Sequence, residues 1–337
     1  MANNVVKVNG IAIANIAKLN GITDANLAKL NGEEFTGFTY SGITWSTDDT
    51  TPVSFSGGIH MGIIGADAIV NCNDKNATGY KATYEHDGSS WSTTGNCAGT
   101  HGVGAGGGTQ TAGVIFNGWD DVGGDESNVT EEYNGSTWAT GNNTVEGSAY
   151  CSGGGSVQTA QLVTGGSKYS PTVRDLSMTQ TYNGTNWANE SVASSGQGPG
   201  SSGESGGGGL DAFLLAGGAL EASGTTAISQ IFDQSAGTWT SKASAGTAAR
   251  YTGSSTDGTR VYKIGGWGGD LSPSFTTSVV VESWVENSWT TESVLTAARN
   301  QSGAGTGGLE SAAGRASAIG GNGTSGATNT YYISAAS

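Results

Sequence analysis

Apolar and polar positions follow the same order from one end of the chain to the other. A short apolar run ends in paired small residues, a glycine-rich loop follows, and a second run leads through an aromatic residue and a polar turn to a tryptophan. The clearest copies are Leu162-Val163-Thr164-Gly165-Gly166 and Tyr182-Asn183-Gly184-Thr185-Asn186-Trp187. Short apolar runs bounded by Gly and Asn are typical of strands. Each unit therefore predicts strand, Gly-Gly, loop, strand, turn, strand.

Near-copies of the aromatic turn recur at almost even intervals. Their aromatic residues are Tyr40 and Trp45, Tyr84 and Trp91, Tyr133 and Trp138, Tyr182 and Trp187, Phe232 and Trp239, Trp284 and Trp289, and, near the C-terminus, Tyr332. By subtraction, successive tryptophans are 46, 47, 49, 52 and 50 residues apart. Repeats of about 50 residues that each hold one supersecondary unit are typical of stacked blades. Asn-Gly predicts a two-residue hairpin turn, and paired glycine predicts backbone with positive φ.

The two ends of the repeat complete one unit. The turn from Tyr40 to Trp45 has no Gly-Gly strand before it, and the strands around Ile319 and Tyr332 have no tryptophan after them. We therefore expect strand four around Trp45 to pair with strand three around Tyr332 and to close a ring without open sheet edges. Five internal units and this composite unit predict six blades. Seven blades would require a degenerate blade hidden in the loops.

Long segments rich in Gly, Ser and Thr separate each tryptophan from the next Gly-Gly strand, such as Ser194 to Gly209 and Ser241 to Thr259. We expect part of each segment to be an innermost strand near the axis, where small residues fit. The remainder would form loops on the faces of the ring, where repeat rings bind partners.

These units resemble the kelch repeat, and more closely a glycine-rich kelch-like variety familiar in tailed-phage and marine viral proteins. The copies that carry this resemblance include Gly107-Gly108-Thr109-Gln110-Thr111-Ala112-Gly113-Val114 and Val157-Gln158-Thr159-Ala160-Gln161-Leu162. The resemblance covers about residues 38–337. It implies an all-β fold, a six-bladed kelch-like β-propeller with four-stranded blades over residues 37–337. A fold of this kind does not by itself specify a function.

Residues 1–36 differ from the rest and predict a docking arm. Lys7-Val8-Asn9-Gly10, Lys18-Leu19-Asn20-Gly21 and Lys29-Leu30-Asn31-Gly32 are spaced 11 and 11 residues apart. Each unit fits either one helical turn stopped by Asn-Gly or short strands joined by an Asn-Gly turn. A segment this short cannot bury its own apolar surface, so it should dock on another subunit or on copies of itself. The alternatives are a flexible tail and a strap that lies on the propeller. The apolar residues of the arm are Ile16, Leu19, Ile22, Leu27 and Leu30.

Composition and charge limit which classes of partner the protein can bind. Glycine supplies 59 of 337 residues, but the nine tryptophans, six of them evenly spaced, favour an ordered chain over a disordered one. The formal net charge of −15 with only 13 basic residues argues against nucleic acid as a partner. No apolar stretch approaches 18 residues and the N-terminus lacks a signal-peptide pattern. We therefore expect that the protein is made in a host cytoplasm and does not insert into a membrane.

Candidate chemistry is sparse, so we expect no catalytic residue, no metal and no cofactor. The histidines are His60, His86 and His101, without metal-ligand spacing, and Cys72, Cys97 and Cys151 form no CxxC pair. The acidic pairs Asp48-Asp49, Asp120-Asp121 and Asp125-Glu126 offer oxygen ligands for calcium, although solvated loop carboxylates are the favoured interpretation.

Two tryptophans, Trp119 and Trp267, lie outside the repeating set, just after the Gly-strand turn. They are candidates for stacking on a glycan or on a protein partner. The simpler alternative is that they fill space between blades.

We expect a non-enzymatic virion structural protein, located at the tail or the capsid. Its arm would bind other virion proteins or copies of itself, and its propeller would serve host attachment or surface decoration. The alternatives are a cellular scaffold propeller and a carbohydrate-active enzyme.

Overall fold

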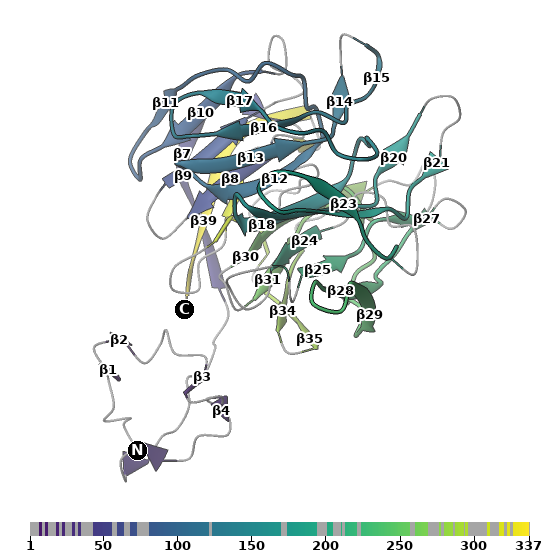
Figure 1. The fold of residues 1–337 in the computed structure, drawn as a ribbon. Coiled ribbons are helices and arrows are strands. Elements are labelled where there is room, and N and C mark those ends of the chain that lie inside the picture. Colours follow the sequence, from purple (N-terminus) through teal and green to yellow (C-terminus); the bar gives the residue numbers. More distant parts are fainter. Residues whose placement is uncertain are drawn as a thin grey trace.

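The computed structural model contains strands and connecting turns but no α-helix in the residues that it describes (Figure 1). These are residues 7–8, 11–12, 18–19, 22–23, 29–30, 33–34, 43–55, 59–63, 68–72, 81–120, 123–169, 174–193, 201–204, 210, 213–220, 224–256, 260–268, 276–277, 280–285, 287–292, 294–295, 309–310, 317–319, 322–323 and 326–336. Within these ranges no helix has the length and hydrophobicity needed to cross a bilayer. The expected all-β class is therefore confirmed.

Three antiparallel sheets share one layout, and we call each a blade named after its innermost strand. Their orders are β12-β13-β16-β17, β18-β19-β22-β23 and β24-β25-β28-β29. The first blade contains β12 (Ala105–Thr109), β13 (Ala112–Phe116), β16 (Thr130–Tyr133) and β17 (Trp138–Thr140). The second contains β18 (Ser152–Val157), β19 (Ala160–Thr164), β22 (Thr179–Tyr182) and β23 (Trp187–Asn189). The third contains β24 (Ser201–Glu204), β25 (Phe213–Ala216), β28 (Ser229–Asp233) and β29 (Thr238–Lys242).

A nine-stranded sheet joins two further ladders of the same layout through one short strand. Its order is β11-β10-β9-β8-β36-β30-β31-β34-β35. The β8 half contains β8 (Ile59–Ile63), β9 (Ala68–Cys72), β10 (Thr83–His86) and β11 (Trp91–Thr93). The β30 half contains β30 (Gly253–Thr256), β31 (Val261–Ile264), β34 (Val281–Val285) and β35 (Ser288–Thr291), and the joining strand is β36 (Leu309–Glu310).

The innermost strands follow one another around a ring. Strand β8 contacts β12, β12 contacts β18, β18 contacts β24, and β24 contacts β30. Strand β36 then pairs in parallel with both β30 and β8. The described sheets therefore have a propeller-like arrangement, with their first strands around the centre and their fourth strands outside (Figure 1).

The chain ends meet in one further sheet, as the sequence predicts. It contains β7 (Ile43–Phe55), β37 (Ser317–Ile319), β38 (Asn322–Gly323) and β39 (Gly326–Ala336). Strand β39 pairs antiparallel with β37 on one side and with β7 on the other. The expected closing pair of N-terminal strand four and C-terminal strand three is confirmed.

The register corrects two of the repeat aromatics. Trp45 is opposite Ser334, whereas Tyr332 is opposite Thr47. In the β8 half, Trp91 is opposite His86, whereas Tyr84 is opposite Thr93. The sequence interpretation placed Tyr84 and Tyr332 in the aromatic position of their copies. A shift of two residues keeps a side chain on the same face of a strand, so alternation alone cannot distinguish the two registers.

The remaining copies keep the expected pairs across the third and fourth strands. Their opposite residues are Tyr133 and Trp138, Tyr182 and Trp187, Phe232 and Trp239, and Trp284 and Trp289. The rings are in contact in the first three pairs, with centroids 4.8, 5.0 and 5.3 Å apart. Tyr40 lies outside the described residues.

The aromatic turn is not centred on Asn-Gly. Asn134 donates its N–H to the Thr137 carbonyl, and its side-chain oxygen accepts the N–H groups of Ser136 and Thr137. The central residues are therefore Gly135, with φ of 92°, and Ser136. The asparagine side chain caps the turn from its first position, and this capping moves the centre of the turn by one residue.

Glycine is concentrated where backbones approach one another. A Cβ added at Gly107 of β12 would lie 2.4 Å from the carbonyl oxygen of Gly155 in the neighbouring innermost strand β18. The expected small innermost strands are thus confirmed for β12 and β18. Both glycines of the pair Gly165-Gly166 have positive φ, at 64° and 92°, which confirms that prediction.

The apolar core lies between neighbouring blades. Phe116 of β13 meets Trp187 of the next blade edge to face, with ring centroids 4.8 Å apart. The same cluster contains Val114 and Val163 from the second strands of the two blades. Each blade therefore buries its aromatic turn against its neighbour, which no isolated blade could do.

The N-terminal segment forms three antiparallel hairpins, so the strand alternative is the observed one. The pairs are β1 (Lys7–Val8) with β2 (Ile11–Ala12), β3 (Lys18–Leu19) with β4 (Ile22–Thr23), and β5 (Lys29–Leu30) with β6 (Glu33–Glu34). Each pair encloses an Asn-Gly dipeptide, the two-residue loop that favours such hairpins. Ile16 and Leu27 lie outside the described residues.

Candidate ligand site

The connections of each blade alternate between two faces of the ring. In the β12 blade, the turns from β12 to β13 and from β16 to β17 share one end, which we call the turn face. The connection from β13 to β16 lies at the opposite end, which we call the hairpin face. The chain also passes from the fourth strand to the next blade on the hairpin face, because antiparallel strands alternate in direction.

Small two-stranded hairpins extend the hairpin face. They are β14 (Trp119–Asp120) with β15 (Asp125–Glu126), β20 (Ser167–Lys168) with β21 (Arg174–Asp175), β26 (Ala219–Leu220) with β27 (Gly224–Thr225), and β32 (Trp267–Gly268) with β33 (Thr276–Thr277). Each begins directly after the Gly-Gly position of its blade. Figure 1 shows β14, β15, β20 and β21 projecting beyond the blades.

Backbone bridges tie the start of these hairpins to the loop before each innermost strand. Gly102 bridges Trp119, Ala149 bridges Ser167, and Arg250 bridges Trp267. The two candidate tryptophans therefore occupy the same position in different blades. Both are half-buried at the inner end of the hairpin face.

A continuous row of five aromatic side chains connects these two tryptophans. Trp119 contacts Tyr169 with centroids 5.4 Å apart, Tyr169 contacts Tyr150 at 6.3 Å, Tyr150 contacts Tyr251 at 5.3 Å, and Tyr251 contacts Trp267 at 5.4 Å. We call these five residues the axial aromatic row. Tyr150 and Tyr251 precede the innermost strands β18 and β30, which have the β24 blade between them. The row therefore crosses the centre of the ring.

A cation lies against one end of the row. The Arg250 guanidinium carbon is 5.2 Å from the centroid of the Tyr251 ring and 6.0 Å from that of Trp267. Contacts of this length are attractive because the ring face is negative. Near the other end, Tyr169, which follows Trp119 in the row, is 37 % exposed.

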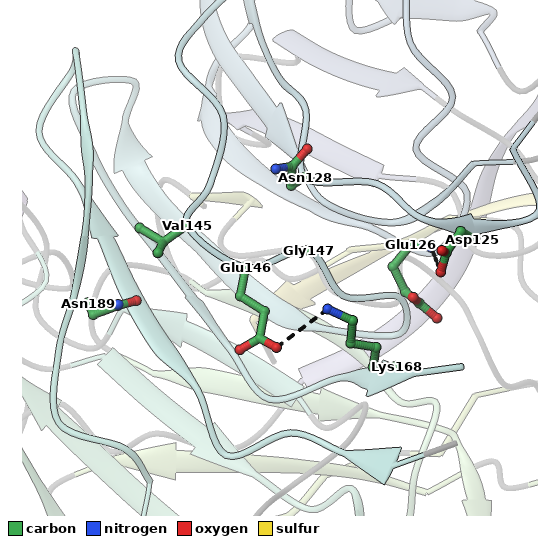
Figure 2. Close-up of a pocket in the computed structure, with 8 residues that line it drawn as sticks. All are labelled: Asp125, Glu126, Asn128, Val145, Glu146, Gly147, Lys168 and Asn189. Carbon is green, nitrogen blue, oxygen red and sulfur yellow. Dashed lines mark hydrogen bonds and ion pairs between the residues drawn. The ribbon is translucent and has the colours of Figure 1, made fainter. Parts of the chain in front are cut away.

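A polar pocket with a volume of about 540 Å³ (Figure 2) lies next to the end of the row that Trp119 and Tyr169 form. Glu146 and Lys168 form an ion pair across it, with 3.6 Å between Oε1 and Nζ. Glu126 accepts a hydrogen bond from the N–H of Tyr169 and is opposite Trp119 in the β14–β15 hairpin, so the pocket and the row are contiguous. The pocket is lined by Asp125, Glu126, Asn128, Val145, Glu146, Gly147, Lys168 and Asn189.

The electrostatics of the pocket favour neutral or positive groups. Burial, together with a hydrogen bond to Asp125, raises the pKa of Glu126 above its ordinary value of 4.5. Three carboxyl groups and one ammonium group line the pocket, so an anion entering it meets net repulsion.

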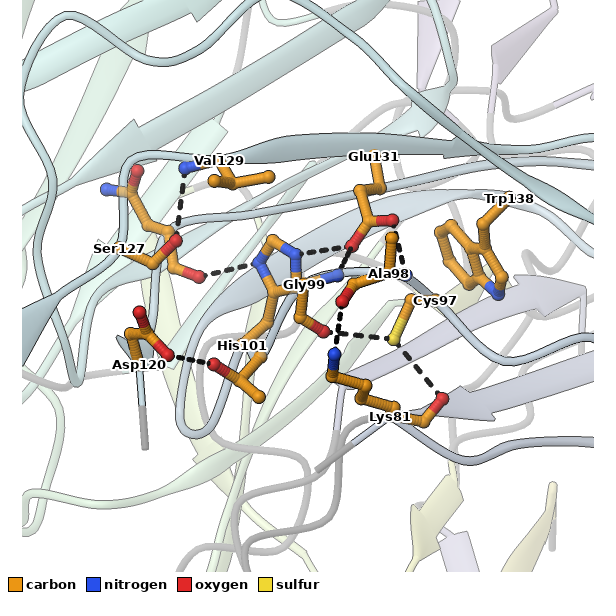
Figure 3. A network of polar contacts seen from close by, with 12 residues as sticks. Lys81, Cys97, Ala98, Gly99, His101, Asp120, Ser127, Val129, Glu131 and Trp138 are labelled. Carbon is orange, nitrogen blue, oxygen red and sulfur yellow. Dashed lines mark hydrogen bonds and ion pairs between the residues drawn. The ribbon is translucent and has the colours of Figure 1, made fainter. Parts of the chain in front are cut away.

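A buried network of polar contacts lies among the connecting loops of the hairpin face (Figure 3). Glu131 accepts hydrogen bonds from the N–H groups of Ala98 and Gly99 and pairs with His101 Nε2 at 2.9 Å. His101 Nδ1 lies 2.9 Å from the Asn117 carbonyl oxygen. Both His101 and Glu131 are almost completely buried. These groups hold the connecting loops in place and do not line the pocket.

The acidic pairs named in the sequence do not converge on a metal centre in the described part of the chain. No group of three or more His, Cys, Asp and Glu side chains there is arranged to hold an ion. Asp120 accepts a hydrogen bond from Thr100, at 2.5 Å. Asp121 lies outside the described residues, and only the strand backbone is described at Asp48 and Asp49.

The histidines and cysteines have separate positions. His86 packs on Trp91 with centroids 4.9 Å apart, and His60 is buried in β8. Cys97 and Cys151 are buried and form no disulfide bond within the described residues, and burial raises the pKa of Cys151 to about 12. The side chain of Cys72 is not described.

The sequence interpretation found the two ends of the row but missed Tyr150, Tyr169, Arg250 and Tyr251. A periodic signal was present for two of them, since Tyr150 and Tyr251 each follow a repeat tryptophan, Trp138 and Trp239, by 12 residues. The corresponding residue after Trp91 is the buried Val103. Because most copies lack an aromatic there, the repeat alone did not mark the position.

Comparison with known proteins supports the fold alone. No protein-family model matches the sequence. No curated protein matches it either. Among solved structures, the chain is similar to the structure of YjhT, with a TM-score of 0.67 and 15% sequence identity over 85% of this chain and 96% of that one. At this identity the likeness establishes a shared β-propeller architecture and leaves the ligand to the site itself.

Proposed function

We propose that this protein is a non-enzymatic binding propeller whose hairpin face carries the ligand site. The observation that supports this proposal is the axial aromatic row, in which side chains from three parts of the ring meet beside a polar pocket. Half-buried aromatic rings with a few polar groups nearby are typical of ligand sites. The arrangement offers stacking surfaces and hydrogen-bonding groups.

The proposed ring has six blades. Three blades, the two halves of the nine-stranded sheet and the sheet formed by the chain ends account for this number. The place of β36 between β8 and β30 supports the count, because that strand is where the first strand of the composite blade belongs. Residues 37–337 would then form one propeller after the arm.

We place this propeller on a virion, as a tail- or capsid-associated structural protein of a tailed phage. The support is the resemblance of its repeat to glycine-rich kelch-like viral proteins and the three evenly spaced hairpins of residues 1–36. In this proposal the arm binds other virion proteins or copies of itself, and the propeller serves host attachment or decoration.

Immunogold labelling of purified particles, with antibody against residues 38–337, tests this placement. We expect gold at the tail for host attachment or over the shell for decoration. Deleting residues 1–36 should abolish incorporation into particles. Unlabelled particles would contradict the virion role and favour a cellular scaffold propeller, whose partners would then be sought by pull-down.

A further inference from the structure

The side chains on the hairpin face indicate which class of ligand it binds. The axial aromatic row starts at the polar pocket and ends at Trp267, where Arg250 lies against the rings. Its members come from separate loops, so their contacts depend on ring closure. A ligand along this row would meet several aromatic surfaces in succession and a group of polar side chains at one end.

Two members of the row have a backbone conformation that L-residues rarely adopt. The φ angles of Tyr150 and Tyr251 are 53° and 54°. Left-handed backbone is unfavourable for a non-glycine residue because Cβ comes too close to the following carbonyl oxygen. The equivalent residue before β12, Val103, has the same φ of 53° and is buried, so the unusual backbone belongs to this position of the repeat. What distinguishes Tyr150 and Tyr251 is that this backbone carries aromatic rings, which meet at the centre of the row with centroids 5.3 Å apart.

The pocket indicates the charge of the ligand. Asp125, Glu126 and Glu146 are opposed by one ammonium group, that of Lys168, which already pairs with Glu146. The carboxylates can accept hydrogen bonds from hydroxyl groups, and the amides of Asn128 and Asn189 can both donate to and accept from them. With a chain net charge of −15, an anionic ligand such as an acidic polysaccharide is disfavoured.

We propose that the axial aromatic row and the adjoining pocket bind an uncharged glycan. Sugar rings stack on the aromatic side chains, and their hydroxyl groups hydrogen-bond to the pocket carboxylates and amides. This assignment rests on the proposed function, because it takes the hairpin face as the binding face. It specifies the ligand class and the residues that make the contacts.

Affinity electrophoresis of the full-length protein in gels containing galactomannan, dextran or mixed-linkage β-glucan tests the assignment, with alginate as the anionic comparison. We expect at least one neutral polysaccharide to retard the protein and alginate to have no effect. Trp267→Ala and Tyr251→Gly should each weaken the retardation at least tenfold. Val157→Ala, at an exposed position on the turn face, should leave it unchanged.

Tyr251→Gly separates a ligand role from a purely structural one. Glycine relieves the backbone strain at this position, so the variant should keep its cooperative thermal unfolding while losing glycan binding. Equal retardation of all variants, retardation by alginate alone, or retardation by no polysaccharide would each overturn the assignment. Deletion of residues 1–36 and immunogold labelling test incorporation into particles separately. The outcomes above would therefore leave the proposed virion role unaffected.

Discussion

Trp187 donates its indole N–H to the hydroxyl of Thr130 in the preceding blade, at 2.9 Å and across 57 residues of sequence. The same contact recurs around the ring. Trp138 donates to Thr83, Trp239 to Thr179 and Trp289 to Ser229, at 3.0, 2.9 and 3.2 Å. The repeating tryptophan therefore links neighbouring blades as well as filling space between them.

Removing this link should destabilise the ring by a measurable amount. Trp187→Phe keeps a ring against Tyr182 but loses the donor, and Thr130→Val loses the acceptor. We expect each single change to lower the free energy of unfolding. The double variant should lose less than the sum, with a coupling energy of about 1 kcal/mol, in urea denaturation. Strict additivity would mean that the hydrogen bond contributes nothing.

Gly107 should tolerate a methyl group far less than Gly124. An added Cβ at Gly107 would lie 2.4 Å from the Gly155 carbonyl oxygen, whereas at Gly124 no atom lies within 4 Å. Gly124 has φ of 67°, so alanine there costs only backbone strain, about 1 kcal/mol. We expect Gly107→Ala to lower the melting temperature several times more than Gly124→Ala. Similar losses would contradict close packing of the innermost strands.

The Glu131 carboxyl should make stability depend on acid pH. Burial opposes its ionisation, but hydrogen bonds from His101 and from the N–H groups of Ala98 and Gly99 outweigh burial and lower the pKa below 4.5. A group whose pKa is lowered by folding contributes stability above its unfolded pKa and loses it as the pH falls through the folded value. The contribution should therefore be complete at pH 7 and decline below about pH 4.5.

Glu131→Gln tests this dependence with an isosteric side chain. The equivalent residue of the next blade is already glutamine, since Gln180 accepts the N–H of Val145 at 2.6 Å. We expect the variant to be less stable than the wild type by about 1–3 kcal/mol at pH 7. The difference should shrink below pH 4.5 in urea denaturation. A difference that is constant with pH would assign the loss to packing.

Lys263 and Glu282 should show strong coupling because both are buried. Their Nζ and Oε2 atoms lie 2.7 Å apart, with each side chain 2% exposed. Burial lowers the pKa of Lys263, and Glu282 opposes that shift. Lys263→Met leaves a buried carboxylate without its cation, which should cost about 3–5 kcal/mol. Lys263→Met combined with Glu282→Met should recover part of that loss in chemical denaturation, and no recovery would contradict the pairing.

The sequence by itself determined the class of fold and the closure of the chain ends. Strands, paired glycines and tryptophans are local patterns with a fixed period, and a period of about 50 residues already implies blades. The pairing of the strands around Trp45 and Tyr332 followed because the first copy of the repeat lacks a Gly-Gly strand and the last copy lacks a tryptophan. The small innermost strands followed from the crowding of backbones near an axis.

Only the tertiary structure decided the register and the site. His86, not Tyr84, lies opposite Trp91, because a two-residue shift preserves alternation and leaves no trace in the pattern. Tyr150 and Tyr251 are 101 residues apart by subtraction, yet their rings meet with centroids 5.3 Å apart. Such a contact exists only once the ring has closed and brought distant loops to its centre. The repeat therefore encodes the blades, and their closure creates the aromatic row.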